Sequence, residues 1–418
     1  MVNSRYSSLT RGELAILVPE LLLCGHLIDR SGMAHAIGAF GREGMTGVAI
    51  DEWRLASPIY TRRMRAALGI TGDGVVAIFK GFQLDIGAPP QFMDFRYRVD
   101  DHDNGAFHLD HCGALADVEP MGEEYVVGMC HHIEDPTFDA TALATNPHAR
   151  VRPLHRPPRV PADRTPVCAW TVTIDRSQPP FEAPADALAL AETRAATVEL
   201  AAIEQDGDGR HDYAGPLLND LRFTDFSRSA LIRMADEVCL QQHLLTLGFR
   251  RAVAERSDSA VALGITRKQF IGIAGITAER LRLALGLGDD AAALAKVLRL
   301  HPALNPADYV DAEVSSETHG GERTVELRLG RDCGAVADGA WAALVDDTHL
   351  EALNALARGV NPRFEVRVRS VTDTALTVEF GLSATPFREA GEVAITRFST
   401  GADFSFTDRG IPLPLTVL

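Results

Sequence analysis

The spacing of hydrophobic and polar residues predicts helices first and strands afterwards. Apolar residues keep helical spacing through residues 10–40 and again through 51–68, and a shorter apolar pattern covers 75–83. Residues 95–99 then alternate apolar side chains with arginines, which is the period of a strand. The triplet 103–105 (DNG) tolerates positive φ and ends that strand. This part of the chain therefore begins with helices and continues as a hairpin.

Further helices and strands follow the hairpin. Residues 106–112 form its second strand, and a helix is expected over 123–134. The dipeptide at 135–136 (DP) predicts the start of another helix, because aspartate caps and proline fits the first turn. The proline- and arginine-rich segment 153–164 is expected to be irregular. β-Branched residues predict a last strand over 167–174.

The same order of patterns returns in the second half, which indicates a tandem duplication. Matching blocks keep their order along the chain, although the offset between them drifts by a few residues. Cys24 and Cys239 fall at matching positions in the first block and are expected to pack in the core. The matching blocks are 24–37 with 239–253, 63–69 with 280–286, 111–114 with 332–335, 146–152 with 361–367, and 177–181 with 383–387.

These patterns predict an α+β fold in which one unit occurs twice, each copy having N-terminal helices followed by an antiparallel sheet and a packed helix. The first repeat, 1–204, is expected to carry a metal or active site and to bury its own core. A charged, glycine-rich linker is placed at 205–224. The second repeat, 225–418, is expected to be a degenerate, structural or regulatory copy, with a hairpin turn around 319–321.

Composition narrows the range of partners. A hydrophobic content of 46% with 23% charged residues is ordinary for a globular protein. The net charge of −16 disfavours nucleic acid and anionic membranes, because phosphates would be repelled. Six scattered cysteines are typical of a reducing compartment, so a cytoplasmic location is predicted. The expected partner is a small-molecule substrate, with no nucleic acid and no membrane. Assembly of the chain into a homo-oligomer is left open.

Metal-capable side chains concentrate at one place in the first unit, on the second hairpin strand. His108, Asp110 and Cys112 occupy alternate positions, so they are expected to share one face of that strand. The matching face of the second unit is largely apolar. His108 and Asp110 are therefore expected to project into core space, where a polar group needs a partner or a metal.

The helix predicted after this strand adds a second group. Cys130 and Glu134 lie one turn apart beside the expected buried stripe, so they are predicted to point inward. His131 and Asp135 point more nearly opposite, towards solvent or a second wall of a cleft. The second unit carries different residues at the matching positions, which places the site in the first unit alone.

Thiolate, imidazole and carboxylate ligands together favour Zn²⁺, with Fe²⁺ as the alternative. Such a metal would lower the pKa of a bound water, and a nearby carboxylate would move its proton. Cys168 and Asp110 are left unassigned. The predicted metal ligands are His108, Cys112, Cys130 and Glu134, and the predicted catalytic groups are Glu134, Asp135 and His131.

The order of these landmarks resembles the L-2-amino-thiazoline-4-carboxylate hydrolase-like family. The resemblance implies a metal-dependent hydrolase that cleaves a carbon–nitrogen bond of a small, cyclic, amidine-like substrate, and a degenerate second copy of the same fold. The landmarks lie within residues 45–175 and are Cys112 at a strand end, Cys130 with acidic residues after it, the dipeptide at 146–147 (NP) and Cys168 near the last strand. The resemblance implies that the site residues include Cys112, Cys130, Asp135 and Cys168.

Two other classes of function fit the same residues. One is a non-catalytic sensor of a small molecule, of a metal or of redox state, in which the cysteines respond without turnover. The other is an iron-dependent lyase or oxidative enzyme, because cysteine, histidine and carboxylate ligands also suit iron.

Overall fold

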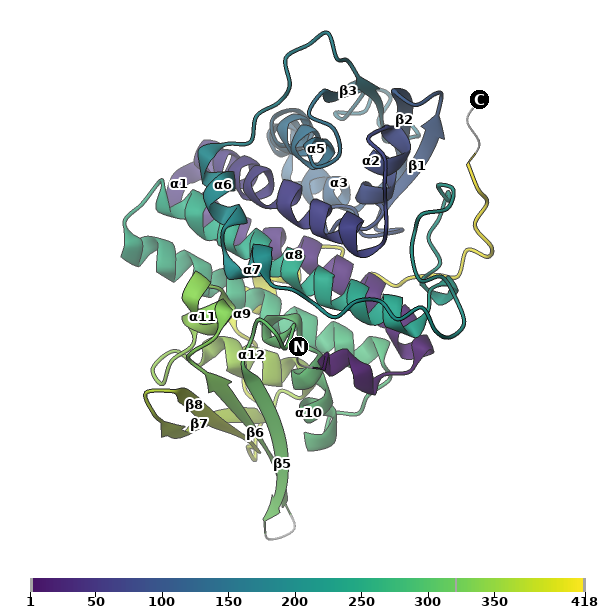
Figure 1. Cartoon of the computed structure of the whole chain (residues 1–418). Coiled ribbons are helices and arrows are strands. Elements are labelled where there is room, and N and C mark those ends of the chain that lie inside the picture. Colours follow the sequence, from purple (N-terminus) through teal and green to yellow (C-terminus); the bar gives the residue numbers. More distant parts are fainter. Residues whose placement is uncertain (1–2, 320–321, 416–418) are drawn as a thin grey trace.

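A computed structural model describes residues 3–319 and 322–415. Two similar units follow each other along the chain, and each contains long helices and a four-stranded antiparallel sheet. The sheets lie at opposite ends of the molecule, with the long helices between them (Figure 1). The predicted α+β fold and its tandem duplication are confirmed.

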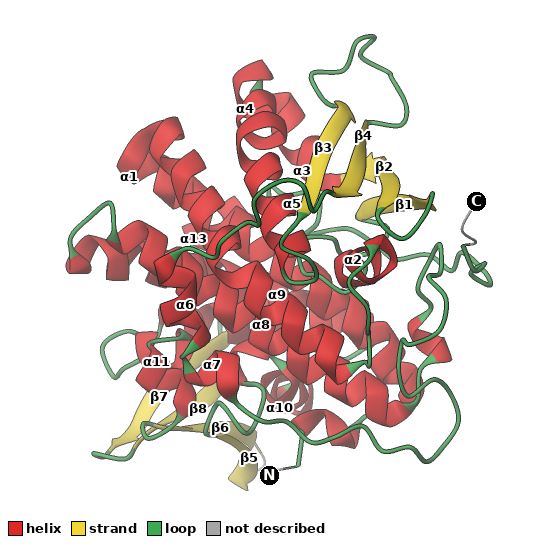
Figure 2. Ribbon diagram, turned by 45° about the horizontal axis from the view of Figure 1, so that its top comes forward, coloured by secondary structure: helices red, strands yellow, loops and turns green. Residues whose placement is uncertain are grey.

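The first unit forms its sheet in the strand order β1-β2-β4-β3, with every neighbouring pair antiparallel. Figure 2 shows this sheet beside a group of shorter helices. The elements are η1 (Arg5–Ser8), α1 (Arg11–Ala67), α2 (Val75–Phe82), β1 (Met93–Val99), β2 (Asn104–Cys112), α3 (Gly113–Val118), η2 (Glu119–Met121), α4 (Glu123–Val127), the π-helix η3 (Gly128–Ile133), α5 (Glu134–Leu143), β3 (Ala149–His155), β4 (Cys168–Ile174), α6 (Ala185–Ala191) and α7 (Arg194–Thr197).

The second unit repeats this plan, with the strand order β5-β6-β8-β7. The turn expected around 319–321 includes two residues outside the described ones, and the strands on either side of it pair as a hairpin. The elements are η4 (Phe223–Asp225), α8 (Arg228–Ala254), α9 (Ser259–Ala284), α10 (Ala291–Leu300), η5 (Pro302–Leu304), β5 (Ala312–His319), β6 (Glu322–Gly330), α11 (Gly334–Asp338), η6 (Trp341–Leu344), α12 (Glu351–Val360), β7 (Phe364–Val371), β8 (Ala375–Leu382) and α13 (Gly391–Thr396).

The first long helix is a pair of helices joined at a glycine. Thr10 caps its N-terminus in a capping box with Glu13. Gly41 has φ 70° and ψ −178°, a conformation that only glycine adopts without strain, and the chain bends there. The two halves of α1 therefore correspond to the separate helices α8 and α9.

Reciprocal contacts fix how the two units correspond. Arg280 Nε lies 2.9 Å from Glu20 Oε2, and Arg63 Nε lies 2.9 Å from Glu237 Oε2. Glu20 and Glu237 are 217 positions apart, as are Arg63 and Arg280. Because a helix has no room for an insertion, this offset holds along the helices, so Cys24 corresponds to Gln241. The predicted match of Cys24 with Cys239 is wrong by two residues, although both thiols are buried.

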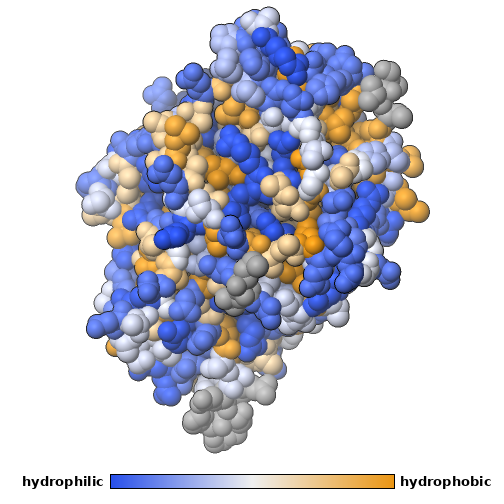
Figure 3. Space-filling view, in the orientation of Figure 1, coloured by the Kyte–Doolittle hydropathy of each residue, from blue (hydrophilic) through white to orange (hydrophobic). Residues whose placement is uncertain are grey.

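The hydrophobic core is continuous between the units. Its largest cluster contains Leu14 and Tyr60 of the first unit together with Leu244 and Phe364 of the second. The first unit does bury a separate cluster around its sheet, whereas the core of the second unit is shared with the first, because α1 packs along both α8 and α9. The outer surface mixes hydrophilic and hydrophobic residues over the face in Figure 3. Among the described helices, none has the length and apolar character of a bilayer span.

Two local predictions in the first unit were wrong. Pro153 belongs to β3, which is an edge strand and can therefore lack one backbone donor. Asp135 does not cap a new helix, since α4, η3 and α5 follow one another without a break and Ile133 precedes α5 in helical geometry.

Candidate functional site

The predicted strand residues do not share one face. Leu109 pairs with Phe95, whereas Cys112 pairs with Met93, and the change in register marks a β-bulge between them. The bulge reverses the alternation, so Cys112 turns into the core while His108 stays 42% exposed. The expectation that His108 projects into core space is wrong for this reason.

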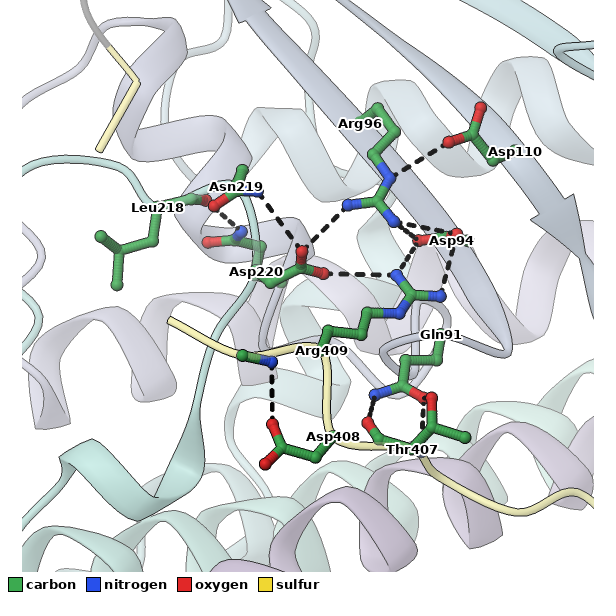
Figure 4. A network of polar contacts seen from close by, with 12 residues as sticks. Gln91, Asp94, Arg96, Asp110, Leu218, Asn219, Asp220, Thr407, Asp408 and Arg409 are labelled. Atoms are coloured by element: carbon green, nitrogen blue, oxygen red, sulfur yellow. Dashed lines mark hydrogen bonds and ion pairs between the residues drawn. The ribbon is translucent and has the colours of Figure 1, made fainter. Parts of the chain in front are cut away.

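His108 and Asp110 belong instead to a polar network on the outer face of the sheet. His108 Nε2 lies 3.3 Å from Asp110 Oδ1, and Arg96 Nε lies 3.2 Å from Asp110 Oδ2. Arg96 also contacts Asp94, which binds Arg409 from the C-terminal segment at 2.6 Å (Figure 4). This network fastens the end of the chain to β1 and leaves His108 away from the other predicted ligands.

The helical residues lie as the helical geometry predicts. Cys130 is 2% exposed and points into the core, and the buried Oε2 atom of Glu134 has no hydrogen-bond partner among the described residues. His131 Nε2 lies 2.7 Å from the carbonyl oxygen of Pro157, and Asp135 pairs with Arg156 at 2.5 Å. His131 and Asp135 therefore contact the loop after β3 rather than the interior.

Three cysteines and one acid meet in the core of the first unit. Burial, followed by repulsion from Glu134, raises the pKa of Cys112 to about 12, and the same two causes raise the pKa of Cys130 and of Cys168. Cys112 and Cys168 add to the shift at Cys130, so these thiols lie near one another. The resemblance gave roles to these three cysteines, and the acid beside them is Glu134 rather than Asp135.

The donor types in this cluster suit zinc, but the geometry does not form the predicted metal site. Within residues 3–319 and 322–415, no group of three or more His, Cys, Asp or Glu side chains is arranged to hold one metal ion. His108 also lies on the opposite face of the sheet. Binding of Zn²⁺ or Fe²⁺ by Cys112, Cys130 and Glu134 without His108 stays a prediction.

A large cavity lies next to this cluster. Its volume is about 610 Å³, and its wall is formed by α1, β1, the segment from α3 to α5, and residues 395–400 of the second unit. Apolar side chains such as Met33, Met45 and Phe138 cover most of the wall. A cavity of this size, with mainly apolar walls and a few polar groups, is typical of a small-molecule site.

The polar part of the cavity centres on Arg30. Its guanidinium lies 3.2 Å from Asp29 Oδ2 through Nη1 and 3.3 Å from Asp117 Oδ2 through Nε. Trp53 Nε1 faces the other oxygen of Asp29 at 3.4 Å. Both carboxylates are at most 10% exposed, so one arginine neutralises two buried acids.

Further ionisable groups near Arg30 are buried without enough partners. Burial raises the pKa of Glu134 to about 8 and that of Asp85 to about 6. Glu52 has a strongly raised pKa, first from burial and then from repulsion by Asp29, and its two oxygens have no partner among the described residues. Burial and then the Arg30 charge lower the pKa of His26 to about 3. Such perturbed groups around one cavity mark a candidate functional site.

In the second unit, buried side chains occupy the space that corresponds to this cavity. His243 corresponds to His26 by the offset of 217, and its ring lies 4.9 Å from Tyr309 and 5.1 Å from Trp341. Trp341 is 1% exposed and stacks on Phe270 at 5.4 Å. The site is therefore confined to the first unit, and the second unit builds core in its place.

The sequence prediction missed the residues at the centre of the cavity. His26, Asp29 and Arg30 lie in a helix whose apolar residues suggested only core packing. With the offset of 217, Asp29 corresponds to Thr246 and Arg30 to Leu247. Glu52 likewise corresponds to Gln269. The loss of charge in the second copy is the signal that would have revealed them.

The chain matches no family model, and comparison with curated proteins and with solved structures finds no similar protein.

Proposed function

We propose that the chain is a hydrolase that cleaves a carbon–nitrogen bond of a small molecule bound in the cavity of the first unit. The observation that carries this proposal is the 610 Å³ cavity in which Glu134, with a pKa of about 8, lies on the same wall as the Asp29–Arg30–Asp117 group. The resemblance to the L-2-amino-thiazoline-4-carboxylate hydrolase-like family supports the same reaction class.

The charges favour a substrate with a cationic, amidine-like end and an apolar body. Asp29 and Asp117 share a single arginine, and Asp85 on the same wall adds an acid with one oxygen that has no partner among the described residues. A planar cation beside these acids would relieve their repulsion and lower their raised pKa values. The apolar wall would cover the rest of the molecule.

Glu134 is suited to move the proton. Its pKa near neutrality allows it to take a proton from water as the oxygen attacks the amidine carbon, and to return it to the departing nitrogen as the carbon–nitrogen bond breaks. One water is consumed, and no oxidant or reductant is needed. In this scheme Arg30 positions Asp29 and Asp117, and the apolar wall limits the entry of other water.

Turnover of a panel of small cyclic amidines, followed by mass spectrometry for the gain of one water, tests this proposal. Glu134→Gln keeps the shape and should reduce kcat at least about 100-fold, the usual contribution of one proton-transfer group. His132→Ala, on the exposed side of the same helical segment, should leave turnover unchanged. Turnover that survives Glu134→Gln would refute the role of Glu134.

A second function, a non-catalytic sensor of metal or redox state, is favoured by one observation. Cys112, Cys130 and Cys168 gather close to the cavity, and none of them forms a disulfide. Free thiols are compatible with a reducing compartment, and a cytoplasmic location remains our proposal. Elemental analysis of the wild type and of Cys130→Ala tests whether this cluster takes up zinc or iron.

A further inference from the structure

We infer that the second unit gates the cavity of the first through a short arm, residues 398–400, which Asp117 holds shut. This inference rests on the proposal that the cavity binds a ligand. It gives the second unit, whose described residues fill the space that corresponds to this cavity, a defined part in the site.

The arm is held by hydrogen bonds to one carboxylate. Ser399 Oγ donates to Asp117 Oδ2 at 2.5 Å, and both the backbone N–H and the Oγ1 of Thr400 donate to Asp117 Oδ1 at 2.7 Å. Asp117 is also the carboxylate that faces Arg30 Nε at 3.3 Å. Asp117 therefore belongs both to the polar part of the cavity and to the contact that holds the arm.

Firm anchors on both sides limit the movement to these few residues. Before the arm, α13 packs on α9, and Arg397 pairs with Glu279 at 2.7 Å. After the arm, Arg280 donates to the carbonyl oxygens of Gly401 and Ala402 at 2.8 Å. Arg280 is itself fixed by Glu20. Movement of Phe398 to Thr400 would break their bonds to Asp117 and the local turn bonds of Phe398 and Ser399, but neither anchor.

The apolar side chains of the arm lie at the mouth of the cavity. Ile395, Phe398, Ser399 and Thr400 all belong to the cavity wall, yet Phe398 is 88% exposed. Met121, which lines the same cavity, is 50% exposed. A bound apolar ligand would allow Phe398 to bury its ring, so occupancy favours a closed arm.

In the second unit, an aspartate that corresponds to Asp117 makes a similar contact, but buried side chains fill the space beneath it. Asp338 corresponds to Asp117 and accepts from the backbone N–H groups of Arg194 at 3.0 Å and Ala195 at 2.8 Å. These residues follow α6, as Ser399 and Thr400 follow α13. The space below Asp338 is filled by Trp341 and its neighbours. Removing either aspartate breaks the contact to the segment that follows the matching helix, and Asp338 also loses a bond from the hydroxyl of Tyr309 at 3.0 Å, but only the loss of Asp117 opens a cavity.

Stopped-flow fluorescence of the neutral apolar dye N-phenyl-1-naphthylamine with the full chain tests this inference. Asp117→Ala should raise the association and dissociation rates about tenfold, the factor expected when one or two hydrogen bonds are lost. Asp338→Ala should leave both rates within about twofold, since equivalent bonds break without opening a path to the cavity. The double variant Ser399→Ala/Thr400→Val keeps the Asp117–Arg30 pair and the backbone bond of Thr400 but removes the two side-chain bonds to Asp117, so it should also accelerate exchange, which covers a failure of Asp117→Ala to fold.

Control results separate the gate from the binding site. Ala116→Trp fills the cavity and should abolish the fast dye signal, because Ala116 lines its wall. Equal rates for the Asp117, Asp338 and arm variants would overturn the gate while leaving the cavity as a binding site. Absence of dye binding to the wild type, or binding that survives Ala116→Trp, would overturn both the gate and the proposed binding site.

Discussion

The Nε atom of Arg30 lies 3.3 Å from Oδ2 of Asp117, and this pair joins a long helix of the first unit to the contact with the second. Arg30 belongs to α1 and touches Asp29 on its other side. Asp117 belongs to α3 and holds Ser399 and Thr400. A change at Arg30 is therefore expected to affect both the stability of the chain and the mouth of the cavity.

Replacement of Arg30 tests how strongly this group stabilises the fold. Arg30→Ala leaves Asp29 and Asp117 buried without a counter-charge, so the free energy of unfolding should fall by about 3 kcal/mol. Urea unfolding measures the change. Arg42→Ala removes an arginine of the same cavity wall that pairs with the exposed Glu124, and should cost no more than about 1 kcal/mol. Equal losses for the two variants would mean that Asp29 and Asp117 do not depend on Arg30.

The raised pKa of Glu134 predicts a particular dependence of stability on pH. Its folded-state pKa of about 8 lies above its ordinary value of 4.5, so the folded protein retains a proton that the unfolded chain releases. The stabilisation due to this proton is complete below pH 4.5 and is lost as the pH rises through about 8.

Glu134→Gln removes this titration. Relative to the wild type, the variant should gain stability between pH 4.5 and 8, with no further gain above that range. Chemical unfolding of ligand-free protein at a series of pH values measures the difference. A constant difference across the whole range would show that Glu134 has an ordinary pKa in the folded chain.

Matched tryptophan variants test the claim that the second unit has filled its cavity. Trp341→Ala should lower stability by about 3–5 kcal/mol, because it opens a hole in a packed core. Trp53→Ala, on the wall of the existing cavity, should cost less than half as much. Indole should raise the melting temperature of Trp341→Ala more than that of the wild type, since it can refill the hole. A smaller loss for Trp341→Ala than for Trp53→Ala would contradict the comparison.

Thiol reactivity separates buried thiols from activated ones. Burial raises the pKa of Cys112, Cys130 and Cys168, so these groups should be protonated and unreactive towards a disulfide reagent at pH 8. Cys333 is the partly exposed cysteine and should react first. All six should react in denaturant. Rapid labelling of Cys130 in the folded protein, identified by mass spectrometry, would favour the sensor over the hydrolase.

The fold was largely predictable from sequence, and the site only in part. The hairpin of β1 and β2 followed from the period of two and a DNG turn, which are local signals. His108 and Asp110 were wrongly expected to share the inward face with Cys112, because a bulge depends on how two strands pair, and periodicity does not report it. The inward direction of Cys130 and Glu134 was predictable, since a helix fixes side-chain directions locally.

The cavity itself depended on long-range packing. Asp117 and Thr400 are far apart in sequence, and only the arrangement of the two units brings them together. The two-residue error in matching α1 with α8 also misaligned Asp29 and Arg30 with their counterparts Thr246 and Leu247. With the correct offset, sequence comparison would have pointed to α1, but not to the arm of the second unit.

The central claim, a single ligand site in the first unit, is tested most directly by NMR of methyl-labelled methionines during titration with benzamidine. Met33, Met45, Met93, Met121 and Met129 line the cavity, whereas Met64 and Met234 lie elsewhere in the core. The account predicts that resonances of the cavity group shift together and saturate with one dissociation constant while those of Met64 and Met234 stay in place. Saturating shifts at Met64 or Met234 with the cavity group unchanged, or no shifts at all, would contradict it.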